Sequence, residues 1–438
     1  MTPSPPYRAL RIAQLPVCGA IIAGIALLGL VGVIPAAYSA SISATVLAGL
    51  AAVAFLWSGS NLLSLIFLLY TFLVLIVAYP AEYMQEGATL FLIVLLGFCL
   101  GRTIDLFQHE STAGTVREIR SESRIPGVLI AGLVLQAAAL LYLLSTYGIK
   151  GFYSGAYMAD EIKNYSRGSS NALLTAVIYV GTLLGIAGVG IYVSRGKASR
   201  YLVGFALLGM PLLNLARSEI VAGGICITYI YRRSIKLWHI FVIAVLALFC
   251  AVFIGRLRQS QLQGGAANLS TLGAIAGELS VSQCVHYIME DIHTDGISGG
   301  ASLVGPVITM PIPRAIFPDK PELTSARIMM KYLPYDAENG FYLAPTIFGD
   351  WLYNFGYPGL LIISLLLGLM IRRIDKGPVS FVGVVFSYAI FVILRNNTAQ
   401  SFLFVVVCFA VREMDRFKIV SHSRSSDPSM PRLPAQGI

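Results

Sequence analysis

Charged residues are scarce in this chain. Only 12% of its 438 residues are charged, whereas 56% are hydrophobic, and ordinary soluble domains are about a quarter charged. A soluble core cannot bury so much apolar surface, so the composition excludes a soluble domain and indicates that the excess faces lipid. The net charge of +9 does not indicate nucleic acid, because most basic residues flank hydrophobic segments.

Sequence motifs for metals and nucleotides are also lacking. Of the six cysteines only Cys284 lies in a polar segment, so we expect neither a disulfide framework nor a metal site. The acidic residues Glu290, Asp291 and Asp295 lie close together, but their spacing fits no calcium loop. No Walker A loop, Rossmann fingerprint or internal repeat is present, which argues against an ATP-driven pump. We therefore expect no cofactor.

Hydropathy predicts an all-α, polytopic membrane protein with about twelve transmembrane helices. The basic N-terminus resembles a signal peptide, but the apolar run that follows approaches a spanning length, so we expect an uncleaved first helix. The expected helices are 16–34, 39–57, 61–79, 87–101, 125–145, 171–193, 201–216, 219–231, 237–255, 355–371, 377–394 and 398–411. They divide the chain into helices 1–9 with short loops (1–255), a large loop (256–354), helices 10–12 (355–411) and a tail (412–438).

The distribution of positive charge predicts the topology. With the N-terminus inside, 20 of the 31 lysine and arginine residues fall on cytoplasmic segments, as the positive-inside rule requires. Both termini are then cytoplasmic, and the large loop lies on the periplasmic face of a bacterial inner membrane. One continuous helix over 201–231 would place the basic cluster at 232–236 outside. Charge therefore favours a helical hairpin whose tip, at Arg217 and Ser218, stops within the membrane.

Several cations are expected on the outer face. Arg217 lies at the hairpin tip, Arg256 and Arg258 follow the ninth helix, and Arg395 follows the eleventh. An arginine at such a position often snorkels to water or anchors a helix end, and this ordinary role stays open for each. Fixed guanidinium groups are also well suited to an anionic head group.

A proline-rich segment in the large loop adds two more cations. Prolines between Pro311 and Pro321 predict a rigid, non-helical chain that fixes Arg314 and Lys320 in place. Two fixed cations suit a diphosphate. An exposed structural loop is the alternative.

Glu278 and His286 are the candidates for proton transfer. They are eight residues apart, about two helical turns, and can share one face of a helix. The apolar residues at 272–292 have helical spacing, so this helix could lie flat on the membrane. A carboxylate or an imidazole there could serve as general base for a sugar hydroxyl.

A second acidic candidate precedes the tenth helix. Asp350 and Asn354 lie among Trp351, Tyr353 and Tyr357, and the three aromatic residues predict an interfacial belt that needs no function. A carboxylate and an amide within that belt are less easily explained by anchoring alone.

Three segments together resemble the bacterial O-antigen (oligosaccharide repeat-unit) polymerases of the Wzy type. They are Gly277-Glu-Leu-Ser280, Ile312-Pro-Arg314 with Pro318-Asp-Lys-Pro321, and Phe348-Gly-Asp-Trp-Leu-Tyr-Asn-Phe-Gly-Tyr-Pro-Gly359. The resemblance covers residues 277–371, and the remaining helices agree in topology only. Asp350 departs from the pattern, since the family has glutamate there. The chain also resembles the GT-C class of glycosyltransferases in its polytopic fold and large periplasmic loop.

The resemblance implies a glycosyltransferase that uses a polyprenyl-diphosphate-linked donor. A hydroxyl of one undecaprenyl-diphosphate-linked glycan would attack the anomeric carbon of another, and undecaprenyl diphosphate would leave. A chain-length regulator and a flippase are further partners that the family suggests. Without a metal, cations would bind the diphosphates, with Glu278 the preferred base and His286 the reserve; Asp350 is a third catalytic candidate, and Tyr353 and Asn354 would position substrate. The expected diphosphate ligands are Arg217, Arg256, Arg258, Arg314, Lys320 and Arg395.

Two other functions remain open at the level of sequence. An O-antigen ligase shares the topology and the large loop, and a histidine base would suit it better. A flippase or another transporter should carry charged residues deep in its helices, whereas nearly all charges here map to helix ends and loops.

Overall fold

The computed structural model describes residues 62–72, 74–75, 83–104, 125–153, 172–195, 198–213, 217–232, 281–309, 321, 323–335, 345–395 and 398–425. Predictions that concern other residues, including the helices at 16–34, 39–57 and 237–255, lie outside these ranges. Within the described ranges the chain is helical and has no β-strand, which confirms the all-α prediction for this part.

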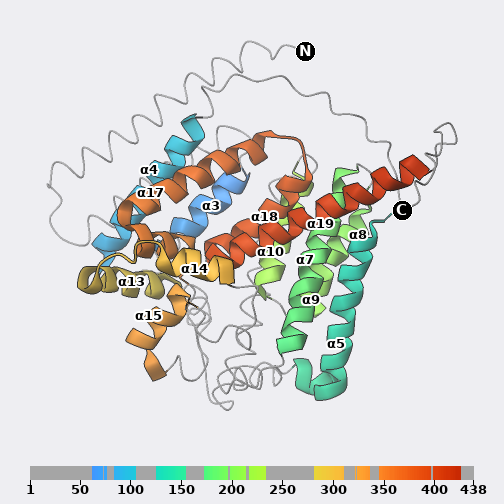
Figure 1. Cartoon of the computed structure of the whole chain (residues 1–438), viewed down its shortest axis with the longest axis horizontal. Helices are drawn as coiled ribbons and strands as arrows, with labels where there is room; N and C mark the ends of the chain where they lie inside the picture. The colour runs from blue at the N-terminus through green and yellow to red at the C-terminus, as the bar shows by residue number, and fades with distance from the viewer. Residues whose placement is uncertain are drawn as a thin grey trace, which may run out of the picture.

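The helices follow one another in the order shown in Figure 1, and each of the nine predicted within the described ranges corresponds to a helix in the structure. They are α3 (Leu62–Phe72), α4 (Met84–Ile104), α5 (Gly127–Tyr153), α7 (Ala172–Ser194), α8 (Arg200–Gly204), the π-helical η3 (Phe205–Gly209), α9 (Met210–Leu213), α10 (Arg217–Ile230), α13 (Val281–Asp295), α14 (Ala301–Thr309), α15 (Thr324–Tyr332), α17 (Thr346–Lys376), α18 (Phe381–Arg395) and α19 (Thr398–Ser425).

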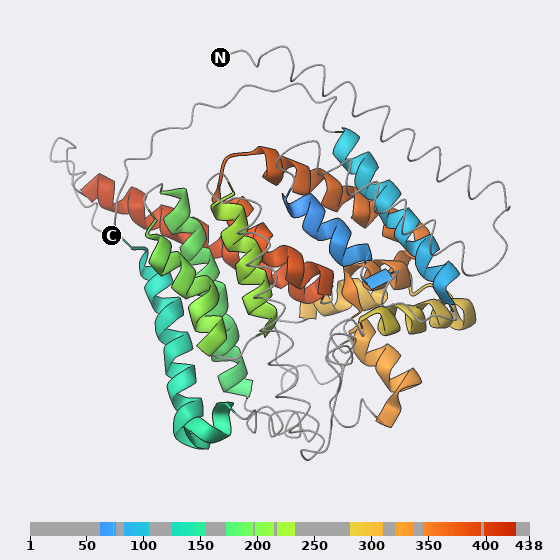
Figure 2. The same ribbon diagram turned by 180° about the vertical axis from the view of Figure 1, so that it is seen from behind.

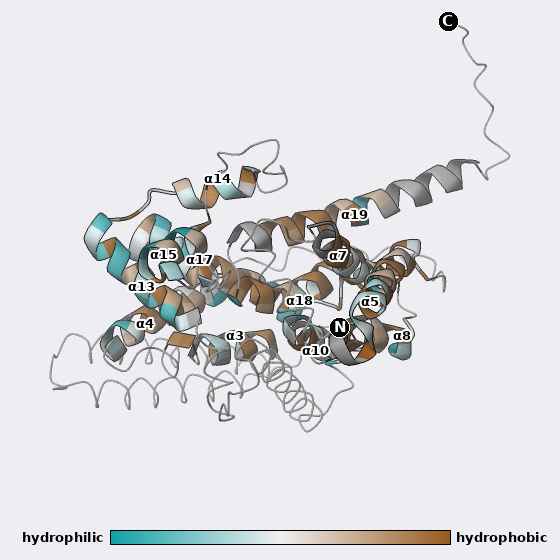
Figure 3. Ribbon diagram, turned by 90° about the horizontal axis from the view of Figure 1, so that it is seen from below, coloured by the Kyte–Doolittle hydropathy of each residue, from teal (hydrophilic) through white to brown (hydrophobic). Residues whose placement is uncertain are grey.

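Three helices are long and apolar enough to cross a membrane, namely the Gly127–Ile149 part of α5, the Val177–Ser194 part of α7, and α17. On α5, Ile130, Val134 and Leu141 are 50%, 59% and 66% exposed, and Figure 3 shows hydrophobic residues along α5, α7 and α18. Exposed apolar side chains on successive turns are typical of a lipid-facing helix. Composition and these helices together indicate a membrane protein.

Small residues let α4 and α17 approach closely. A Cβ added to Gly97 would lie 2.5 Å from the carbonyl oxygen of Leu361, and one added to Gly101 would overlap the carbonyl of Leu365. From the other side, a Cβ on Gly368 would overlap the backbone of Phe98. Because lipid offers no hydrophobic drive between helices, such close backbone contact is a main source of association.

Glycines also let α5 and α7 approach closely, and Figures 1 and 2 show these two helices side by side. A Cβ on Gly132 would overlap the backbone of Gly185, and one on Gly188 would lie 2.5 Å from the Cα of Leu129. Each pair therefore depends on glycine at the crossing point.

The segment between Arg200 and Ile230 is a helical hairpin. Its two arms, α8–η3–α9 and α10, pack against each other, and a Cβ on Gly223 of α10 would overlap the carbonyl oxygen of Leu207 in η3. The hairpin prediction is thus confirmed over the continuous helix. Both arms are short, with 14 residues in each of the apolar segment Arg200–Leu213 and α10.

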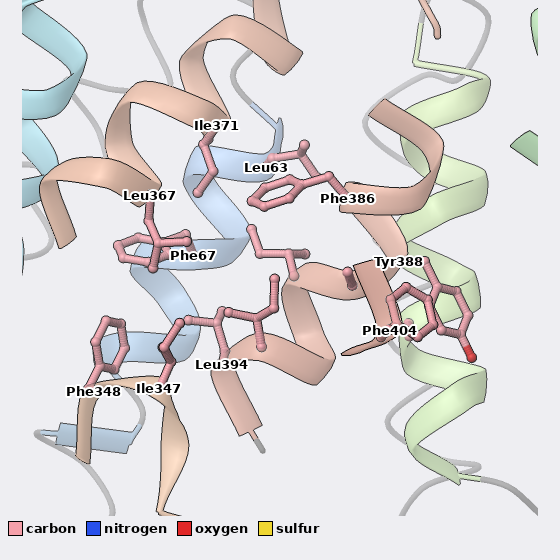
Figure 4. Packing of buried hydrophobic residues seen from close by; sticks show 14 of the residues in the cluster. Leu63, Phe67, Ile347, Phe348, Leu367, Ile371, Phe386, Tyr388, Leu394 and Phe404 are labelled. Atoms are coloured by element: carbon pink, nitrogen blue, oxygen red, sulfur yellow. The ribbon is translucent and has the colours of Figure 1, made fainter. Parts of the chain in front are cut away.

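Buried aromatic residues fill the centre between α3, α4, α17 and α18. Phe67 stacks on Phe98 with ring centroids 4.4 Å apart, and the edge of Phe348 meets Phe67 at 5.9 Å. Figure 4 shows Phe67 between Leu367 and Ile347, while Tyr388 and Phe404 form a second, stacked pair at the edge of the cluster. The core thus extends across helices that are far apart in sequence.

At its C-terminal end, α17 supplies a cap for α3. The carboxylate of Asp375 accepts hydrogen bonds from the backbone N–H groups of Leu63 and Ser64 at 3.2 and 3.3 Å, and it lies 3.8 Å from the guanidinium of Arg102. A carboxylate at a helix N-terminus satisfies N–H groups that lack a partner within the helix. The guanidinium of Arg232, at the end of α10, donates to the last carbonyls of α17. The ends of four helices are thereby fixed together.

The tenth predicted helix begins earlier than hydropathy suggested. α17 starts at Thr346, not at 355, and Gly356 interrupts it with a φ of 65°. The polar first segment was missed because burial against other helices, not apolar composition, stabilises it. Tyr353 is only 2% exposed, so its assignment to an interfacial belt was wrong, whereas Tyr357 is 44% exposed. α19 also continues to Ser425, beyond the expected end at 411.

We expect Gly101→Ala to lower the midpoint of thermal unfolding in detergent. The new methyl group must push the α17 backbone away at Leu365, and overpacking of this kind costs about 1–3 kcal/mol. The matched control is Gly204→Ala, where nothing lies within 4 Å of the new Cβ and alanine should be neutral or stabilising in a helix. Equal midpoints for the two variants would contradict close packing of α4 on α17.

Candidate functional site

Polar side chains gather where α17 begins, beneath three helices of the predicted large loop. We call α13, α14 and α15 the cap. α13 packs on α17 and α15, and α14 packs on α17 and α19. Figure 1 shows the cap against the same end of the bundle as the start of α17, and Figure 3 shows that it is more hydrophilic than α3 or α18. The cap and the first turns of α17 therefore form one polar region.

Asp350 is buried in this region, with 3% of its surface exposed. Its carboxylate accepts a hydrogen bond from the backbone N–H of Thr398, the first residue of α19. The helix dipole favours a negative charge at this position. These contacts give Asp350 a structural role as the N-terminal capping residue of α19. They do not test its predicted catalytic role.

Asn354 joins α17 to the cap. Its amide nitrogen donates to the carbonyl oxygen of Asp350 at 2.7 Å, and its amide oxygen accepts from Ser302 of α14 at 3.0 Å. The Ser302 hydroxyl also lies 3.2 Å from that of Thr324 in α15. Asn354 is fully buried, so it positions protein segments, and a predicted contact with substrate would require the cap to move.

Tyr353 faces an ionic cluster on the cap. Asp291 of α13 is 1% exposed and pairs with the ammonium group of Lys331 in α15. The hydroxyl of Tyr332 lies 3.5 Å from the same carboxylate, and that of Tyr353 also bonds it. Lys331 reaches Asp295 as well, at 3.0 Å. Lys331 thus bridges Asp291 and Asp295, two of the acidic residues whose spacing in sequence fitted no calcium loop.

This ion pairing shifts two titrations. Hydrogen bonding to Lys331 lowers the pKa of Asp295, and the two aspartates raise the pKa of Lys331. A lowered carboxyl pKa means that the pair stabilises the folded state at neutral pH. That contribution is lost only as the pH falls below the ordinary pKa of 3.8.

His286 lies at the other side of α13 and contacts α4. Its Nδ1 is 3.4 Å from a carboxylate oxygen of Glu86, in the first turn of α4. The ring of Tyr83 lies 4.0 Å from the imidazole, between centroids. A carboxylate that accepts from Nδ1–H leaves the lone pair on Nε2, which is the arrangement of an oriented general base. No sequence pattern predicts this pair, because Glu86 and His286 are 200 residues apart.

The rings around His286 continue into a row. His286 is followed by Tyr287, with centroids 5.8 Å apart, and Tyr287 stacks on Tyr332 at 5.1 Å with an angle of 12°. With Tyr83, which is 45% exposed, this aromatic row crosses from α4 over α13 to α15. Its members are Tyr83, His286, Tyr287 and Tyr332.

Of the predicted cations, Arg395 can be placed with its side chain. It ends α18, three residues before the N-terminus of α19 that Asp350 caps, and its charge acts on the hydroxyl of Tyr70 in α3. Arg217 is the first residue of α10, at the tip of the hairpin. The remaining predicted residues, Glu278, Arg256, Arg258, Arg314 and Lys320, lie outside the described ranges.

Comparisons of the chain with protein-family models, with curated proteins and with solved structures find no match.

The Asp291–Lys331 pair should hold the cap in place. We expect Lys331→Met to lower the midpoint of thermal unfolding, because it leaves the buried carboxylate of Asp291 without its charged partner. The double variant Asp291→Asn with Lys331→Met should recover much of this loss, and Glu290→Gln, an exposed carboxylate on the same helix, should change little. The measurement is thermal unfolding, with limited proteolysis of the cap. A double variant that is additive in its two losses would contradict direct pairing.

Proposed function

We propose that this protein polymerises undecaprenyl-diphosphate-linked oligosaccharide repeat units into O-antigen or a related surface polysaccharide, at the periplasmic face of a bacterial inner membrane. The observation that carries the proposal is the aromatic row with a histidine–carboxylate pair inside it, on a polar cap at one end of an apolar helical bundle. Such a site suits a substrate with a sugar at one end and a lipid at the other.

The aromatic row supports a glycan as the ligand. The apolar face of a sugar ring packs on aromatic side chains, and a few polar groups then fix its orientation. The rings of Tyr83 and Tyr287 both lie close to that of His286, so a sugar held on them would have its hydroxyls near the imidazole. Lys331 and Asp295, both exposed, provide polar groups at the far end of the row.

The reaction needs one base and one binding site for the leaving group. A hydroxyl of the acceptor glycan loses its proton to the base, and its oxygen forms a bond to the anomeric carbon of the donor. The bond from that carbon to the phosphate oxygen breaks, and undecaprenyl diphosphate leaves with the electron pair. His286 oriented by Glu86 fits the first task, and Glu278, three residues before α13, remains the other candidate.

Cations would carry the second task. A departing diphosphate is stabilised by guanidinium groups at fixed positions. Arg395 ends α18, three residues before Thr398, whose backbone N–H bonds the buried Asp350, and Arg217 begins α10. We assign both to the diphosphates, together with the predicted cations of the large loop.

A ligase that transfers glycan to a lipid A core is the second candidate, and one observation favours it. The base that the described geometry supports best is a histidine, His286, and a histidine base suits a ligase better than a polymerase. Glycan analysis in cells separates these two functions and transport.

A host that lacks this gene should display a single repeat unit on its lipid acceptor, and the wild-type gene should restore long chains. Loss of all attached glycan would indicate a ligase instead, and cytoplasmic accumulation of lipid-linked units a flippase. In either case the polymerase proposal fails.

The same host tests the base. Glu278→Gln should abolish long chains and leave single-unit capping intact if Glu278 is the base, and His286→Gln should do so if His286 is. General-base catalysis contributes about 10²–10⁴-fold in rate. Its loss is large enough to remove the ladder of glycan chain lengths that a gel of the surface polysaccharide shows. Glu86→Gln should shorten chains less severely, and Glu290→Gln is the matched control. Normal chains from both the Glu278 and His286 variants, at normal protein levels, would remove these residues from the mechanism.

A further inference from the structure

A chain of hydrogen bonds ends on a carboxylate inside the helical bundle. The amide nitrogen of Gln136 in α5 donates to the hydroxyl of Thr182 in α7 at 3.1 Å. That hydroxyl donates to the carboxylate of Glu219 in α10 at 3.3 Å. Both donors point toward Glu219, so the carboxylate is the acceptor that the chain serves.

The chain lies near the middle of the bundle. Thr182 is the eleventh of the 23 residues of α7, and Gln136 is the tenth of the 23 residues in the apolar part of α5. At about 1.5 Å per residue, both are roughly 14–20 Å from either end of their helix. Glu219 reaches this depth because the hairpin is short. Glu219 itself lies in the first turn of α10, so it is at the end of its own helix and beside the middle of α7.

The charge of Glu219 has no compensating cation among the described side chains. The ion pairs of the described residues involve other carboxylates. An ionised carboxyl in apolar surroundings is costly unless a cation neutralises it.

Two more oxygen atoms nearby find no partner among the described residues. The amide oxygen of Gln136 and the hydroxyl of Tyr388 in α18 are both buried there without a hydrogen bond, in residues that are 4% and 2% exposed. The Gln136 oxygen shares its carbon atom with the nitrogen that bonds Thr182. Tyr388 is close enough for the charge of Glu219 to act on its hydroxyl, and Figure 4 shows that hydroxyl directed away from the aliphatic cluster.

We propose that Glu219, Thr182, Gln136 and Tyr388 form an intramembrane site for one monovalent cation, either a proton or a sodium ion. The carboxylate supplies the charge, and the neutral oxygens are the hard ligands that such a cation prefers. The site joins α5, α7, α10 and α18, so its occupancy stabilises the hairpin against the bundle. It goes beyond glycan polymerisation, which consumes no cation at this depth. The other titratable groups that act electrostatically on Tyr388 of this site are Tyr179, Cys226 and Cys408.

Purified full-length protein in detergent provides the test. Thermal unfolding at pH 8 is compared in NaCl and in choline chloride of equal ionic strength, and infrared spectra record the carboxylic-acid band between pH 5 and pH 9. The variants are Glu219→Gln and Thr182→Val, with Glu290→Gln as the control for an exposed carboxylate.

A sodium site predicts that wild type and the control unfold about 2 °C or more higher in NaCl, and that Glu219→Gln removes this difference. A proton site predicts no sodium effect, together with a protonated-carboxyl band at pH 7 that Glu219→Gln removes. For a sodium site, Thr182→Val should change the sodium concentration of half-occupancy about tenfold. For a proton site, it should shift the pH of half-occupancy by about one unit. The proposal is overturned if neither signal depends on Glu219, or if Thr182→Val responds as wild type does.

Discussion

One helix bears an aspartate at each end that caps another helix, and the rest of the described structure depends on these two contacts. Near its start, Asp350 of α17 accepts the first N–H of α19. At its end, Asp375 accepts two N–H groups of α3 and lies beside Arg102 of α4. Each carboxylate is buried, where a polar group without a partner would cost several kcal/mol. The two capping aspartates therefore fix α3 and α19 to α17, while glycine contacts hold α4 against α17.

The break at Gly356 separates these two tasks. Residues after it form the apolar helix that packs against α4, and residues before it face the cap. In the first segment, Tyr353 interacts with Asp291 of α13, and Asn354 accepts a hydrogen bond from Ser302 of α14. The aromatic row with His286 lies on the outer side of this assembly. The buried contacts of α17 thus support the helices that carry the aromatic row.

Much of this arrangement was predictable where local pattern decides it, and little where long-range partners do. Hydropathy located the helices around 125–145 and 171–193, and positive charge alone identified the hairpin at Arg217. Neither pattern identifies the neighbours of a side chain, so the contact between Glu219 and Thr182, in the middle of α7, was not predicted. Asp350 was recognised as unusual for an aromatic belt, but its partner at Thr398 depends on how α18 and α19 pack. Glu86 could not be connected to His286 from sequence, because only the fold brings the two together.

Reconstitution is the most direct test of the proposed polymerase activity at the outer face of the membrane. Purified protein in liposomes would receive an undecaprenyl-diphosphate-linked oligosaccharide, and mass spectrometry would record the length of the lipid-linked products. The account predicts products that grow by whole repeat units, with one undecaprenyl diphosphate released for each unit added. Lipid-linked units that stay single would contradict it, whether they are carried across the bilayer or transferred once to another lipid.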